Sequence, residues 1–175
     1  FADAQRGFIA QLPDGKVLNA DGSVAWDMSE YAFLNDESAP DTVNPSLWRQ
    51  ARLNAIHGLF KVTDGMYQIR GMDLANMTII EGDTGLIIID PLLSPSTARA
   101  GLELYYQNRP QKPVVAVLYT HNHVDHWGGV KGVTSNEDVA SGKTRIYAPA
   151  GFMEHAVSEN VIAGPAMSRR AIYQF

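Results

Sequence analysis

The sequence predicts a layered α/β domain, and three observations carry that prediction. An alternating run at 66–70 and β-branched runs at 77–80 and 86–89 are typical of strands, and a helical stretch at 94–108 leads into a continuous apolar run at 114–119. Strands followed by helices favour a sheet with helices packed on it. The 175 residues are 45% apolar and 19% charged, which suits one globular domain, or one domain and a piece of another.

The first third of the sequence is polar before it becomes helical. Residues 1–44 are rich in turn signals, so we expect an extended arm that packs against the rest of the molecule. The stretch 45–60 predicts a helix, with Asn44 as its N-cap and Pro45 at the first helical position. Apolar residues recur along one face of this helix as far as Phe60.

The central segment predicts a hairpin, a helix and a buried strand. The runs at 77–80 and 86–89 flank a turn that carries Gly and Asp, which is a hairpin pattern. A helix from Ser94 to Asn108 follows, and the uninterrupted apolar run after it is typical of a strand covered on both faces. The remaining elements are expected in this order: a polar loop at 120–132, a short strand near 146–147, a helix at 151–161 and another after Pro165.

The composition argues against several classes of protein and of site. Asp and Glu outnumber Lys and Arg by 19 to 14, for a net charge of −5, which does not suggest a nucleic-acid binder. No apolar run approaches the roughly 20 residues that cross a bilayer. There is no cysteine, so any metal must be held by His, Asp or Glu.

Both ends of the sequence look interrupted. The chain begins at Phe1 rather than Met, carries no basic-then-apolar signal segment and ends without a stop signal, so we expect a processed or shortened chain. The absence of cysteine fits an exported protein, although it also fits many cytosolic ones. On this basis we expect a secreted or periplasmic protein.

The loop after the apolar run carries the most chemical information. Three of the five histidines, His121, His123 and His126, lie within six residues of one another, together with Asp125. In an extended segment His121 and His123 project to the same side and can close on one ion, whereas Asp125 and His126 follow a bend and can face a second ion. These donors suit Zn²⁺, with bonds of about 2.0–2.2 Å, and ions about 3.5–4 Å apart can activate a water. The competing interpretation is a set of loop histidines satisfied by hydrogen bonds and water.

The same loop resembles a known metal-binding motif. The run from Thr120 to Gly129 is similar to the motif of the metallo-β-lactamase superfamily, and the strand ending at Asp90 is similar to the part of that fold that leads to the site. Flanking segments resemble one branch more closely, the zinc-dependent alkyl sulfatases of type III. The segments that carry this likeness are 44–50, 58–60, 69–71, 77–82 and 148–155.

This resemblance implies an αββα sandwich that holds two zinc ions. His121 and His123 would bind one ion, and Asp125 and His126 would bind the other, with Asp125 as the catalytic residue among them. The branch hydrolyses sulfate esters of alkyl chains, such as dodecyl sulfate, to an alcohol and inorganic sulfate. We therefore expect an alkyl sulfate as the small-molecule partner and detergent degradation as the role, with attack at carbon or at sulfur left open.

Two further residues are implied to support the ligands from behind. Asp90 and Thr120 would orient a metal-binding side chain rather than bind metal themselves. For Asp90, an ordinary turn aspartate before Pro91 is an equally weighted alternative.

The resemblance also implies that ligands are missing. In this family two glutamates and a further histidine lie well downstream, and nothing in the chain matches them. We therefore expect the amino-terminal half of a longer enzyme, with residues 1–60 as an arm and a helix and residues 61–175 as the first part of the catalytic domain. The other half would complete the metal shells, the alkyl-chain pocket and the contacts of a homodimer.

Several other polar residues are better explained by structure than by chemistry. Glu154, His155 and Glu159 fall on a predicted helix, where core or surface roles are favoured over metal binding. His57 is expected to be an ordinary histidine of the helix at 45–60, because no second ligand type stands four residues away.

The remaining candidates divide in the same way. Trp127 either lines a substrate channel or anchors the loop. For Met72 and Met77 we expect packing in the core rather than a position at the border of a cleft. Asn76 lies on the same loop, which could border the cleft. We expect the arginine pair at 169–170 to lie at a solvated helix end rather than to bind an anion.

Three alternative functions stay open from the sequence. A thioesterase or lactonase on the same scaffold would use the same metal motif. A di-iron electron-transfer or oxygen-reducing module is disfavoured, because such sites favour a glutamate where this chain has His123. A non-catalytic fragment that binds metal only to stabilise its fold is the third.

Overall fold

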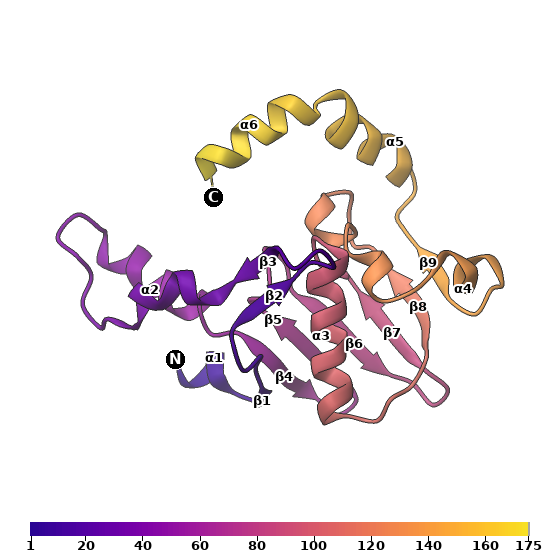
Figure 1. Cartoon of the computed structure of the whole chain (residues 1–175), viewed down its shortest axis with the longest axis horizontal. Helices are drawn as coiled ribbons and strands as arrows, with labels where there is room; N and C mark the ends of the chain where they lie inside the picture. The colour runs from indigo at the N-terminus through magenta and orange to yellow at the C-terminus, as the bar shows by residue number, and fades with distance from the viewer. Residues whose placement is uncertain (175) are drawn as a thin grey trace.

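The computed structural model describes residues 1–174, and its main feature is one mixed sheet (Figure 1). The strand order is β1-β4-β5-β6-β7-β8-β9. Neighbours from β1 to β7 are antiparallel, whereas β7–β8 and β8–β9 are parallel. The strands of this sheet are β1 (Phe8–Ala10), β4 (Gly58–Thr63), β5 (Met66–Arg70), β6 (Met77–Glu81), β7 (Leu86–Ile89), β8 (Val114–Leu118) and β9 (Arg145–Tyr147).

Helices cover one face of the sheet and form its connections, and the longest, α3, runs across that face (Figure 1). A separate antiparallel ribbon of β2 (Lys16–Leu18) and β3 (Val24–Asp27) packs on α3. The helices and helical turns are α1 (Ala2–Gln5), η1 (Met28–Asn35), α2 (Pro45–Asn54), α3 (Pro95–Asn108), η2 (Val124–His126), η3 (Val130–Gly132), α4 (Asn136–Ala140), α5 (Phe152–Val157), η4 (Ser158–Ile162) and α6 (Gly164–Gln174).

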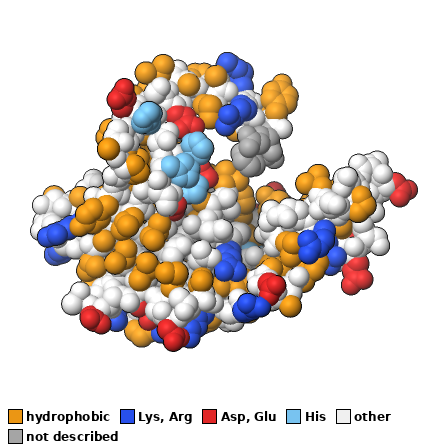
Figure 2. All heavy atoms as spheres, turned by 180° about the vertical axis from the view of Figure 1, so that it is seen from behind, with side chains coloured by type: hydrophobic (Ala, Val, Ile, Leu, Met, Phe, Trp, Pro, Cys, Tyr) orange, Lys and Arg blue, Asp and Glu red, His pale blue; other side chains and the backbone are white. Residues whose placement is uncertain are grey.

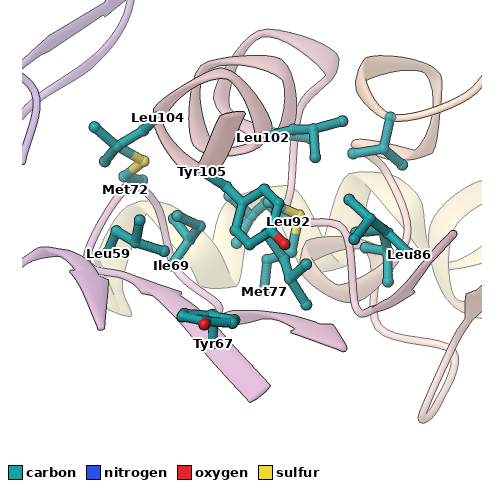
Figure 3. Packing of buried hydrophobic residues seen from close by; sticks show 14 of the residues in the cluster. Leu59, Tyr67, Ile69, Met72, Met77, Leu86, Leu92, Leu102, Leu104 and Tyr105 are labelled. Atoms are coloured by element: carbon teal, nitrogen blue, oxygen red, sulfur yellow. The ribbon is translucent and has the colours of Figure 1, made fainter. Parts of the chain in front are cut away.

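The hydrophobic core lies between α3 and the sheet (Figure 3). Burial alternates along the strands, so that Tyr67 and Ile69 of β5 and Met77 and Ile79 of β6 all belong to the core. Gly101 lets α3 come close to these strands, since a Cβ at that position would stand 3.1 Å from Ile69. Close packing over the strands at this point therefore depends on a residue without a side chain.

Side chains at both ends of α3 fix its position. Ser94 caps the first turn by accepting from the Thr97 amide at 3.2 Å, and the Thr97 hydroxyl accepts from the Ser94 amide at 3.3 Å. Near the other end, the Glu81 carboxylate of β6 accepts from the Tyr105 hydroxyl at 2.6 Å and from Arg109 at 3.0 Å. The helix predicted after Ser94 is confirmed, and so is the hairpin before it.

The helix predicted at 45–60 is wrong in its second half. The helix α2 ends at Asn54, and the strand β4 begins at Gly58. Gly58 has φ 128°, and a Cβ there would lie 2.4 Å from the Ala10 carbonyl oxygen, so the backbone of β1 needs a glycine at this position. Phe60 is fully buried in the sheet rather than on a helix face. Pairing with distant strands thus overrides the local helical pattern.

The amino-terminal arm is more structured than the sequence indicates. Residues 1–44 do pack against the rest of the molecule, but they do so through β1 in the main sheet and through the β2–β3 ribbon on α3. Asn44 caps α2 as predicted, because its side chain accepts from the Ser46 amide at 2.9 Å. The proposed domain boundary at residue 60 stays a prediction.

The far face of the sheet is less covered than the sequence predicts. In β8 only Val117 is buried, and the other four residues of the strand are half-buried. Ile80, Ile87 and Ile89 are half-buried on that side, and Figure 2 shows apolar side chains spread over this part of the molecule. The predicted α/β class is confirmed, as one sheet with a helical layer on one face.

The last elements form a helical arm, residues 152–174, that curves over the end of the sheet (Figure 1). The helices predicted at 151–161 and after Pro165 are confirmed, except that residues 158–162 are π-helical. The predicted polar loop at 120–132 contains two helical turns, η2 and η3. In the part of the chain that the structure describes, no helix is both long and apolar enough to cross a bilayer.

Candidate metal centre

The candidate centre lies where the parallel strands β7 and β8 end. Asp90 directly follows β7 and Thr120 closely follows β8, so both stand at the same edge of the sheet, and the Asp90 amide donates to the Leu118 carbonyl at 3.0 Å. The loop that carries the histidines continues from Thr120. Local sequence and sheet topology together therefore place this loop beside Asp90.

The Asp90 carboxylate is the centre of a hydrogen-bond network. Its Oδ1 accepts from the Thr120 amide at 2.8 Å, and its Oδ2 accepts from the Thr120 hydroxyl at 2.6 Å. The same Oδ2 lies 2.8 Å from His126 Nδ1. Asp90 is 7% exposed, so these bonds compensate for the loss of water around the carboxylate.

These bonds determine which histidine nitrogens are free to bind a metal. Because Thr120 uses its hydroxyl proton on Asp90, it accepts from His121 Nδ1, which lies 2.9 Å away. His126 likewise donates its Nδ1 proton to Asp90. In both imidazoles the Nε2 atom therefore keeps its lone pair, which is the form that binds a metal.

The predicted ligands stand close enough to share cations. The ring centroids of His121 and His126 are 4.1 Å apart, and those of His121 and His123 are 4.6 Å apart. His126 Nε2 lies 3.3 Å from Asp125 Oδ2. Two donors on one tetrahedral zinc ion stand about 3.4 Å apart, so this pair fits a shared cation.

The donor set thus fits zinc, although it is incomplete. Within residues 1–174, no three His, Cys, Asp or Glu side chains are grouped in a way that would hold an ion by themselves. The four predicted ligands, His121, His123, Asp125 and His126, supply two donors to each of two ions at most. The assignment of these ligands, and of Asp90 and Thr120 behind them, stays a prediction.

Two glycines hold the loop against the turn after β7. Gly129 donates its amide to the Leu92 carbonyl at 2.9 Å, and a Cβ on Gly129 would stand 2.0 Å from the Pro91 carbonyl oxygen. A Cβ on Gly128 would stand 2.3 Å from the Leu93 carbonyl oxygen. Backbone therefore packs directly on backbone here, as the sequence predicts for the two glycines.

That turn is itself strained. Asp90 has φ 53° and Leu92 has φ 63°, in the left-handed region that side chains other than glycine rarely adopt. Positive φ at a leucine costs free energy, and such strain is common at functional sites. The Leu92 amide donates to the Asp90 carbonyl at 2.8 Å, which closes the turn.

Aromatic residues join the loop to the helical arm. Trp127 donates from Nε1 to the Asn122 carbonyl at 2.9 Å and packs edge-on against Phe152, with ring centroids 5.9 Å apart. Tyr119 also packs against Phe152, with ring centroids 5.3 Å apart, and burial raises the pKa of Tyr119 to about 12. The structure therefore shows Trp127 in the anchoring role that the sequence left open.

A polar contact between the arm and the loop was missed by sequence reasoning. Glu159 of η4 accepts from Asn122 Nδ2 at 2.6 Å, and its other oxygen lies 3.5 Å from His123 Nε2. The sequence favours a core or surface role for Glu159 and gives no role to Asn122. The contact spans 37 residues, so no local pattern indicates it.

The other candidates lie where structural roles predict. Met72 and Met77 are fully buried in the core, whereas Asn76 is exposed. His57 lies between α2 and β4 rather than in the helix, and its Nδ1 is 3.0 Å from the Ala55 carbonyl. Four polar residues of the arm have exposed side chains: Glu154, His155, Arg169 and Arg170.

A family model described as the metallo-beta-lactamase superfamily matches residues 70–170, which include the whole candidate centre. The chain belongs to this superfamily. Membership confirms the sequence-based resemblance and implies metal ions, typically zinc. A structural neighbour, the stereoselective inverting sec-alkylsulfatase Pisa1 from Pseudomonas sp., matches with a TM-score of 0.92 and 60% identity.

Several relatives with similar sequences are named alkylsulfatases. An (R)-specific secondary-alkylsulfatase from Pseudomonas sp is 59% identical over 99% of this chain. A linear primary-alkylsulfatase from Pseudomonas sp is 60% identical over 98% of the chain. The chain covers 26% of the length of each, and 27% of the Pisa1 structure while 98% of the chain is aligned. It therefore spans about a quarter of the relatives it matches.

Proposed function

We propose that this chain is part of a zinc-dependent hydrolase that cleaves alkyl sulfate esters into an alcohol and inorganic sulfate. The observation that carries the proposal is the Asp90 network, which leaves Nε2 of His121 and of His126 free beside Asp125. The identity of 59–60% to named alkylsulfatases over nearly the whole chain supports the substrate class.

In this proposal the chain supplies ligands and their orientation. His121 and His123 hold one of two zinc ions, and Asp125 and His126 hold the other, with Asp125 closest to the chemistry. Bound zinc supplies positive charge to the sulfate oxygens and lowers the pKa of water. Asp90 keeps His126 in the tautomer and orientation that a cation requires.

A direct experiment can show whether the C–O or the S–O bond of the sulfate ester breaks. Inversion at a carbon centre requires cleavage of the C–O bond, and the similar structure of Pisa1 is that of a stereoselective inverting sec-alkylsulfatase. We therefore propose attack at carbon. Hydrolysis of a secondary alkyl sulfate in ¹⁸O water by the full-length enzyme should place the label in the alcohol, whereas label in the sulfate would mean attack at sulfur.

Substrate assays separate the proposal from its alternatives. The full-length enzyme should hydrolyse dodecyl sulfate and leave acyl thioesters and lactones intact, and the reverse preference would assign a thioesterase or lactonase. Burial of one methylene is worth about 0.8 kcal/mol, so kcat/KM should rise by up to about fourfold per CH₂ between octyl and decyl sulfate.

Three finer points belong to the same proposal. A role in detergent degradation follows from the substrate class. We also propose that the full-length enzyme is a homodimer, which light scattering tests. We propose a secreted or periplasmic location, which fractionation of the cells that produce the enzyme tests.

A further inference from the structure

Each histidine of the candidate centre has a ring nitrogen beside an oxygen atom of a residue outside the predicted ligand set. His121 Nδ1 faces Thr120 and His126 Nδ1 faces Asp90, so both depend on the network at the end of the sheet. Among residues 1–174, no side-chain hydrogen bond joins His123 to that network, although its ring packs edge-on against that of His121. Its Nε2 atom lies 3.5 Å from Glu159 Oε1, which comes from the helical arm.

The Glu159 carboxylate is held in place rather than free in solvent. Its Oε2 accepts from Asn122 Nδ2 at 2.6 Å, and the side chain is 22% exposed, against 56% for His123. Asn122 is also fixed on its backbone side, where its carbonyl accepts from Trp127 Nε1. Figure 2 shows histidine side chains gathered in the hollow beneath the arm, beside acidic ones.

The local helix geometry directs Glu159 at the loop. Residues 158–162 are π-helical, with the Ala163 amide donating to the Ser158 carbonyl at 2.9 Å, and π segments occur often at functional sites. Val161 and Ile162 of the same turn are 69% and 77% exposed. In this turn it is thus the carboxylate, and not the apolar side chains, that reaches the metal loop.

We propose that Glu159 is a positioning residue of the metal centre that acts through His123. Its carboxylate faces Nε2 of His123 at 3.5 Å and favours the proton on that nitrogen, which leaves Nδ1 of the ring to bind the cation. Asp90 acts in the same way on His126, with the two nitrogens exchanged and a shorter distance of 2.8 Å. This inference rests on the proposed function, because it assumes that His123 is a metal ligand. It gives the helical arm a direct part in metal binding.

The test compares Glu159→Gln with Asn122→Ala in the full-length enzyme. Zinc affinity is measured by competition with a chromogenic chelator. The geometry of the metal site is followed in the visible spectrum of the cobalt-substituted protein. The glutamine keeps an acceptor for Asn122 but loses the charge beside His123, so zinc affinity should fall about 10- to 100-fold and the cobalt spectrum should change. Asn122→Ala removes the docking bond alone and should have the smaller effect. Glu154→Gln, an exposed carboxylate on the same arm, is the matched control and should behave as wild type.

The outcomes separate this inference from the proposed function. Wild-type zinc affinity and an unchanged cobalt spectrum in Glu159→Gln would overturn the inference, as would an equal or larger loss in Asn122→Ala. Thermal unfolding of the metal-free variants shows whether either one is misfolded, and Glu159→Asp, which restores the charge, should regain part of the affinity. If the enzyme binds zinc with the expected ranking of variants but does not cleave alkyl sulfates, only the proposed function fails. If the wild-type enzyme binds no zinc, both fail.

Discussion

At the scale of single residues, one buried carboxylate determines the chemistry of its neighbours. Asp90 accepts three hydrogen bonds and holds the donor and acceptor roles of Thr120, His121 and His126 in one arrangement. Removing it would release two imidazoles at once, because His121 depends on Asp90 through the Thr120 hydroxyl.

The first prediction concerns Asp90→Asn. The new amide group is a donor and must face either the Thr120 amide or His126 Nδ1, both of which are donors already. We expect zinc affinity to fall about 10- to 100-fold, measured by competition with a chelator in the full-length enzyme. Asp83→Asn changes an exposed turn aspartate and serves as the control. Equal zinc affinity in wild type and Asp90→Asn would remove Asp90 from the centre.

A second prediction concerns the close approach at Gly129. A Cβ at this position would lie 2.0 Å from the Pro91 carbonyl oxygen and 2.7 Å from that of Ser94, and backbone oxygens cannot move aside cheaply. Gly129→Ala should lower the free energy of unfolding by about 2 kcal/mol or more and weaken zinc binding with it. In Gly164→Ala, where nothing lies within 4 Å of the new Cβ, chemical denaturation should show little change. Similar stability losses in both variants would contradict the role given to Gly129.

Site residues that lie close together in the sequence could be predicted, whereas contacts between distant residues could not. The ligand motif is visible in the sequence because His121, His123, Asp125 and His126 lie within six positions, and their spacing alone carries chemical meaning. The part played by Glu159 is not visible, because it depends on a π-helical turn 37 residues after Asn122.

At the scale of elements, α3 is tied to the sheet by a polar cluster as well as by the core. The hydrogen bonds that Arg109 donates lower the pKa of the Glu81 carboxyl in the folded state, although partial burial opposes this, and Tyr105 adds a further hydrogen bond. The carboxylate is therefore stabilised by folding only when it is ionised.

A third prediction follows for the pH dependence of stability. Because the folded pKa of Glu81 lies below its ordinary value of 4.5, its contribution is fully present above that value and is lost as the pH falls through the lowered folded pKa. Glu81→Gln should therefore be less stable than wild type at pH 7, and the difference in melting temperature should shrink below about pH 4.5. A difference that stays constant down to pH 2 would show that the charge of Glu81 contributes nothing.

The elements also show where sequence patterns fail. The strands from β5 to β7 and the helix α3 could be predicted, since hairpin turns and a capping serine are local signals. The end of α2 could not, because Gly58 and Phe60 take their conformation from pairing with β1, which lies about 50 residues earlier in the chain. The coverage of β8 was overestimated for a related reason, since an apolar run does not say what packs on it.

At the scale of the whole molecule, the described residues form one sheet with helices on one face and half-buried apolar side chains on the other. The metal loop stands at the edge of this sheet, beneath the helical arm (Figure 1). Its four predicted ligands are too few for two ions, and the chain spans about a quarter of its alkylsulfatase relatives. We propose that the full-length enzyme supplies the remaining donors.

We propose above all that the loop between β8 and η3 binds a pair of cations. Anomalous diffraction at the zinc absorption edge from crystals of the full-length enzyme tests it most directly. We predict two peaks about 3.5–4 Å apart, one against His121 and His123 and the other against Asp125 and His126. Zinc-soaked crystals with no anomalous peak beside these side chains would contradict the account.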